Sequence, residues 1–353
     1  MKKILKIILK VLVIIILTVA LFFGYLTVRE YNPADVETLE VMNSGETKAI
    51  DADKNISVMT WNIGYSALGK NQDFIMDGGG NTPDADKQQV GEYYDGIVKT
   101  ADEIGADIRM FQEVDKDSKR SYHNDQRPDL ALADSSYALN YSCDFVPFPW
   151  PPIGKVQSGI FTTADFTMEN ADRYSLPCPF TWPVRIANLK RCMMASYFSV
   201  DGTDKKLVIV NFHLEAYDSG EGKVAQANQL MGFIQSEYEQ GNWVIAGGDW
   251  NQLFPGTLEK YPNTHEDLWL PGYIDSIELP EGWQLAFDSE SPTCRLLNQP
   301  YNPEDTVNTQ LYVLDGFIIS PNVMLNSVET VDKGFENADH NPVLINIGLD
   351  TAQ

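Results

Sequence analysis

The N-terminal segment is the strongest constraint on how this chain folds, because it is too apolar for the surface of a soluble domain. Residues Val11–Val28 carry no charge, and Ile7–Leu9 extend the apolar run beyond Lys10. A transmembrane helix needs about 20 such residues, whereas the apolar core of a signal peptide is usually about 7–15 residues long. The end of the run, Phe22–Leu26, contains no Ala-x-Ala-like cleavage site. Residues 1–28 are therefore predicted to form an uncleaved membrane anchor, with a cleaved signal peptide as the alternative.

Charge sets the expected orientation of this anchor. Four lysines lie within the first ten residues, and an excess of lysine and arginine marks the cytoplasmic side of a membrane-spanning helix. The N-terminus is therefore expected inside and the rest of the chain on the extracytoplasmic side. A polar stretch, residues 29–53, is interpreted as a tether that leads to one domain at residues 54–350.

The part of the chain beyond the anchor is strongly acidic. The first 30 residues hold five of the 26 basic and one of the 50 acidic residues, which leaves 21 basic and 49 acidic residues in 31–353 and a formal net charge of −28. Nucleic-acid binding relies on lysine and arginine contacts to phosphates, so this balance disfavours nucleic acid as a partner. A small anionic substrate held by a local metal ion is compatible with it. The bilayer is an expected partner through the N-terminal helix, and no obligate protein partner is indicated.

Cysteine usage leaves two alternatives open. Cys143, Cys178, Cys192 and Cys294 show no Cys-x-x-Cys spacing, so a zinc site is not indicated. An extracytoplasmic domain permits disulfides, and four cysteines allow three pairings. Isolated buried thiols are the other alternative.

Beyond the tether, short runs rich in Val, Ile, Phe and Tyr are typical of strands. They lie at Ile56–Trp61, Asp107–Gln112, Leu207–Phe212, Trp243–Ala246, Tyr312–Ile319 and Val343–Ile347. Helices are predicted at Gln88–Ile104 and Lys223–Gln240, the second with the apolar spacing of one helix face. This mixture predicts an α/β protein with a mixed sheet and outer helices. Residues 64–87, 115–155 and 251–306 are rich in Gly, Pro, Asn and Asp and are predicted to be long functional loops.

Polar side chains interrupt or follow apolar runs in six short segments. They are Met59-Thr60-Trp61-Asn62, Phe111-Gln112-Glu113, Val210-Asn211-Phe212-His213, Gly247-Gly248-Asp249-Trp250-Asn251, Leu314-Asp315-Gly316-Phe317 and Asp339-His340-Asn341-Pro342. Asp315 stands inside an otherwise apolar strand, where a carboxylate is costly to bury unless it is paired. Carboxylates with asparagine suit a hard cation such as magnesium, whereas two histidines without a histidine-rich ligand set argue against zinc. One such segment has an ordinary structural explanation, but six together predict a metal-dependent site.

In this order, the six segments closely resemble the motifs of the endonuclease/exonuclease/phosphatase superfamily. That family includes pancreatic-type deoxyribonucleases, apurinic-site endonucleases, inositol-polyphosphate 5-phosphatases and bacterial sphingomyelinases. The resemblance spans about residues 54–349, and it rests on the order of the motifs because each one alone is common. It implies a four-layer α/β sandwich, in which two mixed sheets pack face to face with helices outside. The active site is then expected at one rim, between the sheets.

The resemblance also implies a metal site. Glu113 matches the carboxylate that holds the divalent cation, which is expected to be Mg²⁺ or Mn²⁺. Asn62 is expected beside it, in contact with metal or phosphate. Asp339 is expected to complete the metal environment.

Catalytic roles carry over in the same way. Asp249 matches the residue that orients or deprotonates the attacking water, and Asn251 matches one that hydrogen-bonds the phosphate. His340 matches the catalytic histidine and Asp315 its orienting carboxylate, a pairing that fixes the tautomer and stabilises the charged imidazole. His213 is expected to hydrogen-bond a phosphoryl oxygen as charge builds on it. The carboxylate that pairs with this histidine in deoxyribonucleases has no identifiable counterpart in the sequence.

Three further features allow two interpretations each. Lys119 and Arg120 are basic residues close to Glu113 and are predicted to bind substrate phosphate, with a solvated charge run as the alternative. Arg295 could contact substrate or lie on the surface. The aromatic and proline-rich stretch Phe145–Pro152 could form a hydrophobic lip near membrane or substrate, or pack onto the core.

Together these features predict a divalent-metal-dependent phosphoesterase, more narrowly a phosphodiesterase, at the outer face of the cell membrane. The expected substrate is a small phosphoester or a lipid headgroup, because the domain lacks a broad basic face. A surface nuclease cleaving DNA or RNA is the first alternative, since the same catalytic residues would serve it. A catalytically silent binding module is the second, and it is weakened because every expected catalytic position is present.

Overall fold

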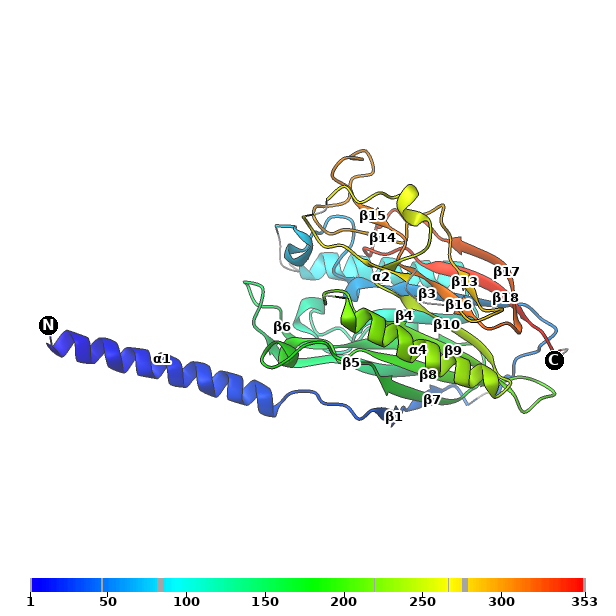
Figure 1. Ribbon diagram of the computed structural model, residues 1–353, viewed down its shortest axis with the longest axis horizontal. Helices are drawn as coiled ribbons and strands as arrows, with labels where there is room; N and C mark the ends of the chain where they lie inside the picture. Colours follow the sequence, from blue (N-terminus) through cyan, green and yellow to red (C-terminus); the bar gives the residue numbers. More distant parts are fainter. Residues whose placement is uncertain are drawn as a thin grey trace.

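The computed structural model describes residues 2–45, 47–80, 85–218, 220–265, 267–274 and 279–351. Figure 1 shows a long N-terminal helix, α1 (Lys2–Val28), that extends away from a domain containing two seven-stranded sheets. At about 1.5 Å per residue, a helix of this length exceeds the roughly 30 Å hydrocarbon core of a bilayer. Within the described ranges, α1 is the one helix long and apolar enough to cross a membrane.

The first sheet has the strand order β1-β7-β8-β9-β10-β16-β13. Its strands are β1 (Val36–Thr38), β7 (Met168–Ser175), β8 (Cys192–Ser199), β9 (Lys206–His213), β10 (Trp243–Asp249), β16 (Asp315–Ile319) and β13 (Gln284–Ala286). Strands β9 and β10 run parallel, and every other neighbouring pair is antiparallel. This sheet is therefore mixed, as predicted.

The second sheet has the order β17-β18-β3-β4-β6-β5-β2. Its strands are β17 (Val323–Thr330), β18 (Val343–Leu349), β3 (Ile56–Asn62), β4 (Ile108–Asp115), β6 (Gly154–Ala164), β5 (Asp134–Val146) and β2 (Val41–Asn43). Here β3 and β4 are the parallel pair. The other helices are α2 (Lys87–Ile104), α3 (Arg127–Leu130) and α4 (Glu221–Glu239). The 3₁₀ turns are η1 (Gly64–Ser66), η2 (Ile75–Asp77), η3 (Lys119–Ser121), η4 (Val184–Ala187) and η5 (Thr257–Glu259). Two short strand pairs are β11 (Gln252–Leu253) with β12 (Gly272–Tyr273), and β14 (Cys294–Arg295) with β15 (Leu311–Tyr312).

Alternate side chains of the central strands fill the space between the two sheets. Val58 and Met110 from one sheet share a buried cluster with Ile209, Ile245 and Phe317 from the other. Successive strand residues point to opposite faces, so their neighbours point outward toward the helices. The sheets therefore pack face to face.

The outer faces of both sheets are covered by helices. Ile97 of α2 lies in a cluster with Trp61 and Phe111, and Leu230 of α4 lies in a cluster with Val244. The order of layers is helix, sheet, sheet, helix. The four-layer α/β sandwich expected from the sequence is confirmed.

The long predicted loop at 115–155 is wrong in part, because β5 and the start of β6 lie within it. Ser135, Ser136 and Asn140 are buried polar residues of β5, so no apolar alternation marks this strand in the sequence. The predicted strand Tyr312–Ile319 is also divided, into β15 and β16.

Two further predictions concern the cysteines and the polar tether. The four cysteines are free thiols, and three of them are buried. The segment interpreted as a polar tether contains β1 and β2, which add an edge strand to each sheet.

Glycine is required at position 248, where β10 packs against the backbone of β9. Gly248 has a φ of +154°, and a Cβ there would lie 1.9 Å from the carbonyl oxygen of Phe212. The backbone of Phe212 cannot move aside without breaking the register that places Asp249 beside His213. The position therefore fixes the spacing of two predicted site residues.

We expect Gly248→Ala to lower the free energy of unfolding by roughly 1–3 kcal/mol, because the new methyl group meets backbone. Gly232→Ala in α4 is the matched control, since a Cβ there meets nothing within 4 Å. That change should be neutral or stabilise by up to about 1 kcal/mol. Urea unfolding of the full-length protein in detergent measures both, and equal stability of Gly248→Ala and wild type would contradict the close approach.

Candidate active site

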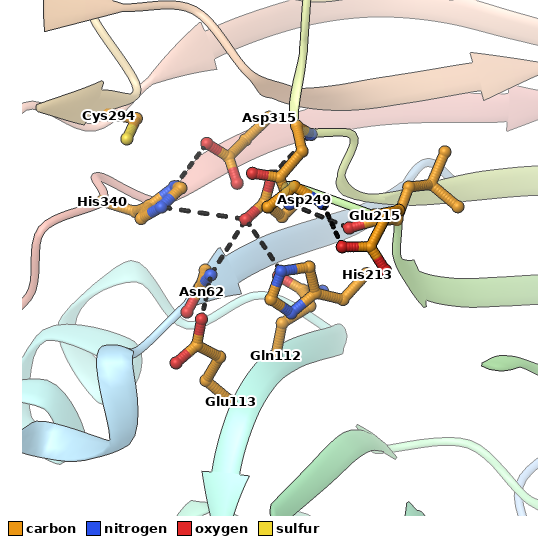
Figure 2. A network of polar contacts seen from close by, with 12 residues as sticks. Asn62, Gln112, Glu113, His213, Glu215, Asp249, Cys294, Asp315 and His340 are labelled. Atoms are coloured by element: carbon orange, nitrogen blue, oxygen red, sulfur yellow. Dashed lines mark hydrogen bonds and ion pairs between the residues drawn. The ribbon is translucent and has the colours of Figure 1, made fainter. Parts of the chain in front are cut away.

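The polar ends of five strands meet at one rim of the sandwich (Figure 2). Asn62 ends β3, Glu113 lies near the end of the parallel neighbour β4, and His213 and Asp249 end the parallel pair β9 and β10. Strand β16 runs antiparallel to β10, so its first residue, Asp315, pairs with Asp249. The sequence places these residues far apart, and the topology brings them to one place.

Asp249 is the centre of the cluster. Its Oδ2 accepts a hydrogen bond from Asn62 Nδ2 at 3.0 Å and lies 3.4 Å from His213 Nε2 and 3.8 Å from His340 Nε2. Its Oδ1 accepts the backbone N–H of Asn251 at 2.9 Å. Burial raises the pKa of the Asp249 carboxyl above its ordinary value, against the opposing effect of His340. Asp249 is thus a buried carboxylate held between two imidazoles.

His340 is held by a second carboxylate. Its Nδ1 lies 2.8 Å from Asp315 Oδ2, and Thr293 Oγ1 accepts the backbone N–H of Asp315. Burial lowers the pKa of His340, but the carboxylates of Asp315 and Asp249 outweigh burial and raise that pKa well above its ordinary value. His340 is therefore cationic near neutral pH, when both ring nitrogens carry protons.

His213 has the opposite character. Burial, with help from the charge of Arg191, lowers the pKa of His213 well below its ordinary value, so the ring is neutral. Asp249, already predicted to orient the water, lies 3.4 Å from its Nε2, and in the described part of the chain no other carboxylate pairs with this ring. Its Nδ1 is buried without a hydrogen-bond partner among the residues that the structure describes.

A buried ion pair braces the strand end at His213, and no sequence motif indicated it. Arg191 Nε lies 3.2 Å from Glu215 Oε2, and Arg191 Nη1 donates to the carbonyl of His213 at 3.1 Å. Both side chains are buried. Removing one partner would leave the other charge uncompensated. Because Arg191 also binds the carbonyl of His213, the pair fixes the backbone at the histidine.

Glu113 and Asp339 line one cavity and carry the carboxylate oxygens that suit a hard cation. Asn62 lines it too, but its Oδ1 accepts the backbone N–H of Gly64. Asn62 Nδ2 donates to Glu113 Oε1 at 3.3 Å, and Asp339 Oδ1 is buried with no hydrogen-bond partner in the described part of the chain. Burial raises the pKa of both carboxyl groups, that of Asp339 to about 7, and the charge of Glu113 contributes to the shift of Asp339. A divalent cation would relieve this burial of negative charge.

A second triad of potential ligands overlaps this one. Asp249, Asp315 and His340 each offer an atom within 4.8 Å of the others. This triad fits a cation less well than Glu113 and Asp339 do, because Asp315 and His340 are already hydrogen-bonded to each other and a cationic imidazole repels a metal ion.

A β-bulge aims Glu113 into the site. The register of β4 against β6 shifts between Phe111 and Val114, and Glu113 has a φ of +56°. Bulges turn a side chain out of the regular alternation and often border active sites. Without the bulge, the regular alternation of side chains along β4 would set the direction of the Glu113 side chain.

A polar bridge joins the two sheets beneath the site. Gln112 Nε2 donates to Asn211 Oδ1 at 2.8 Å, and Asn211 Nδ2 donates to the carbonyl oxygens of Phe111 and Phe161. Both amides are fully buried. They stand out in the sequence as polar interruptions of apolar strands, but their structural role needs the fold.

Asn251 lies in the turn after β10, with a φ of +51°. Its Nδ2 donates to the carbonyl of Leu214 at 2.9 Å, and the residue lines the same cavity as Asp249. The amide carries a second N–H, so it keeps one donor for a ligand.

The two predicted basic ligands differ in position. Lys119 is exposed and its Nζ donates to the carbonyl of Pro152, away from the cluster. Arg120 pairs with Asp115 at 2.9 Å, lies 3.5 Å from the centre of the Tyr65 ring, and lines the cavity. The structure thus brings Arg120, and not Lys119, to the site.

Arg295 is buried and does not lie on the surface. Its Nη2 donates to the backbone carbonyl oxygens of Leu68, Gly69 and Gln72, and its backbone N–H donates to Asp339. Arg295 therefore holds the segment after β3 against the backbone of a predicted metal ligand.

Asp315→Asn should lower the pKa of His340 by at least about one pH unit, because it removes the carboxylate paired with Nδ1. An NMR titration of the histidine ring signals in metal-free, full-length protein measures this, with His340→Gln as the assignment. Asp117→Asn is the control, since Asp117 contacts a different histidine, His123. An unchanged His340 pKa in Asp315→Asn would show that this contact does not set the charge of the ring.

Comparisons with solved structures identify the fold. No family model and no curated protein sequence matches the chain. Among solved structures, an endonuclease/exonuclease/phosphatase from Beutenbergia cavernae is 15% identical, with a TM-score of 0.53 over 85% of this chain and 72% of that one. ANGEL2, a 2',3'-cyclic phosphatase, is 12% identical, with a TM-score of 0.52 over 88% and 99%. Truncated TDP2 from Caenorhabditis elegans is 14% identical, with a TM-score of 0.51 over 84% and 98%. The chain therefore has the endonuclease/exonuclease/phosphatase fold.

Proposed function

We propose that this protein hydrolyses phosphoester bonds with the help of a divalent cation, magnesium or manganese. The observation that carries the proposal is the Asp249 carboxylate, held between a neutral and a cationic imidazole in a cavity that the buried Asp339 and the half-buried Glu113 also line. The fold supports it, because ANGEL2, which shares the fold, is a 2',3'-cyclic phosphatase crystallised with adenosine-2',3'-vanadate. Identity at this level carries the fold alone, so the chemistry rests on the residues of this chain.

Glu113 and Asp339 would hold the cation, and Asn62 would orient Glu113 through its Nδ2. Its chemical contribution when bound would be to neutralise charge on the non-bridging phosphoryl oxygens. The other residues then have separate tasks. Asp249 would orient the attacking water and accept its proton. His213 would donate a hydrogen bond to a phosphoryl oxygen, as would the free N–H of Asn251.

His340 would protonate the leaving oxygen. The contact with Asp315 keeps its ring cationic and oriented, so it has a proton to give near neutral pH. Arg120 lies on the cavity wall and would add positive charge near the phosphate. The site thus separates a proton acceptor from a proton donor, which hydrolysis of an ester requires.

We place this reaction on the outer face of a membrane crossed by α1, with the N-terminus inside. The lysines before the apolar run support that orientation. The net charge of −28 beyond residue 30 supports a compact phosphoester, such as a small molecule or a lipid headgroup, over a long polyanion.

Glu113→Gln should raise the Mg²⁺ concentration for half-maximal activity by at least about tenfold, because a neutral amide replaces an anionic ligand. Hydrolysis of bis(p-nitrophenyl) phosphate by the full-length protein in detergent, titrated with Mg²⁺, measures this. Glu329→Gln, an exposed carboxylate on β17, is the matched control and should behave as wild type. Full wild-type activity in a chelator, or an unaltered Mg²⁺ requirement in Glu113→Gln, would refute the proposal.

The same preparation distinguishes the proposed phosphoesterase from a surface nuclease and from a catalytically silent binding module. A surface nuclease would prefer duplex DNA or RNA over the small ester, and its binding would weaken steeply with salt. A silent binding module would bind a phosphoester without turning it over. We expect turnover of the small diester and weak DNA binding.

A further inference from the structure

The cavity in front of the catalytic residues continues to the N-terminal helix. It has a volume of about 560 Å³, and its lining includes Asp249 and His340 at one end and Phe23 and Leu26 of α1 at the other. Leu26 is 3% exposed, whereas most of α1 is exposed. The same hollow is therefore bounded by the reacting groups and by the helix that is apolar enough to cross a membrane.

Much of the wall between these two ends is apolar and comes from the β5–β6 hairpin and from the segment around η4. Val146 and Phe148 belong to the hairpin between β5 and β6, and Pro183, Val184 and Ile186 belong to the segment around η4. Phe148 is 62% exposed and Val184 is 56% exposed, so the apolar wall reaches the surface. The predicted hydrophobic lip at Phe145–Pro152 thus borders the cavity.

Specific contacts fix the end of α1 beside these loops. Tyr25 Oη and Arg29 Nε both donate to Asp144 Oδ2, at 2.8 Å and 2.9 Å. Trp182 Nε1 donates to Thr27 Oγ1 at 3.1 Å. These contacts come from the end of β5 and from the segment before η4, so the mouth of the cavity lies where α1 leaves its apolar span.

The same surface carries exposed aromatic side chains. Trp150 is 84% exposed and Trp182 is 56% exposed, on the two loops that form the lip. Phe22 and Phe145 pack edge to face across the junction between α1 and the hairpin. Tryptophan and tyrosine gather at membrane interfaces, whereas a large apolar patch is unfavourable on a surface that faces water.

We propose that the substrate is a membrane lipid with a phosphodiester headgroup, taken from the leaflet in which α1 ends. This rests on the phosphoesterase function proposed above and adds the substrate class. The headgroup phosphate lies at Asp249 and His340, and acyl chains lie along the wall formed by Phe148, Val184 and the end of α1. In the reaction the water oxygen bonds to phosphorus and gives one proton to Asp249. One ester P–O bond breaks with its electron pair on the leaving oxygen, which takes a proton from His340.

The test uses full-length protein in vesicles of equal parts phosphatidylcholine, phosphatidylethanolamine, phosphatidylglycerol and sphingomyelin. Mg²⁺ is added outside only, so that molecules facing outward act alone. Each sample gives two rates, hydrolysis of vesicle lipid by mass spectrometry and hydrolysis of external bis(p-nitrophenyl) phosphate. Their ratio does not depend on how many molecules face outward.

Phe148→Glu and Val184→Glu should each lower the ratio of lipid to soluble rate by at least about tenfold, because a charge replaces apolar surface that meets acyl chains. Both side chains are exposed, and the soluble rate reports that the fold and site are intact. Met324→Glu is the matched control, since Met324 is 52% exposed on β17, at the opposite end of the domain from α1 (Figure 1). Its ratio should equal that of wild type.

Three results would overturn the inference. If wild type cleaves the soluble diester and no vesicle lipid, the substrate class is wrong and the proposed function stands. If wild type cleaves neither, the proposed function fails and the inference fails with it. If wild type cleaves lipid but the ratio is unaltered in Phe148→Glu and Val184→Glu, the apolar wall does not bind the lipid.

Discussion

The burial of negative charge at one rim is the constraint on which the rest of this structure depends. Asp249, Asp339 and Glu113 are carboxyl groups whose pKa values burial raises, so the folded chain holds them at a cost in solvation. Partial compensation comes from the cationic ring of His340 and from the amide of Asn62. A divalent cation would neutralise the remaining negative charge, and the sandwich beneath the rim supplies the rigidity that such a site needs.

Much of the site could be predicted because its residues contrast with their surroundings. Asn62, Glu113, His213 and Asp249 follow apolar runs, and a parallel pair within each sheet carries such strand ends to the same edge. The contrast fails where buried residues are themselves polar. Strand β5 was missed for that reason, since its serines and asparagine are buried by pairing with neighbours and not by their apolarity.

Other features depend on contacts between distant segments and have no local signature. Arg191 and Glu215 pair across 24 positions of the chain, and Arg295 binds carbonyl groups more than 220 positions away. The side chains of adjacent residues can also point in different directions. In the 3₁₀ turn at Lys119–Ser121, Lys119 points outward and Arg120 lines the cavity. Charge and spacing alone cannot decide which of two neighbouring basic residues faces a site.

The most direct measurement of the central claim is hydrolysis of a phosphodiester in ¹⁸O-labelled water by wild type, Asp249→Asn and His340→Ala, with a thermal melt of each protein. Wild type should place ¹⁸O from water in the phosphate product in the presence of Mg²⁺. Each variant should lose roughly 10²–10⁴-fold in turnover, the usual scale for lost acid–base help, while its melt shows a folded protein. Turnover near that of wild type in both folded variants would contradict the account.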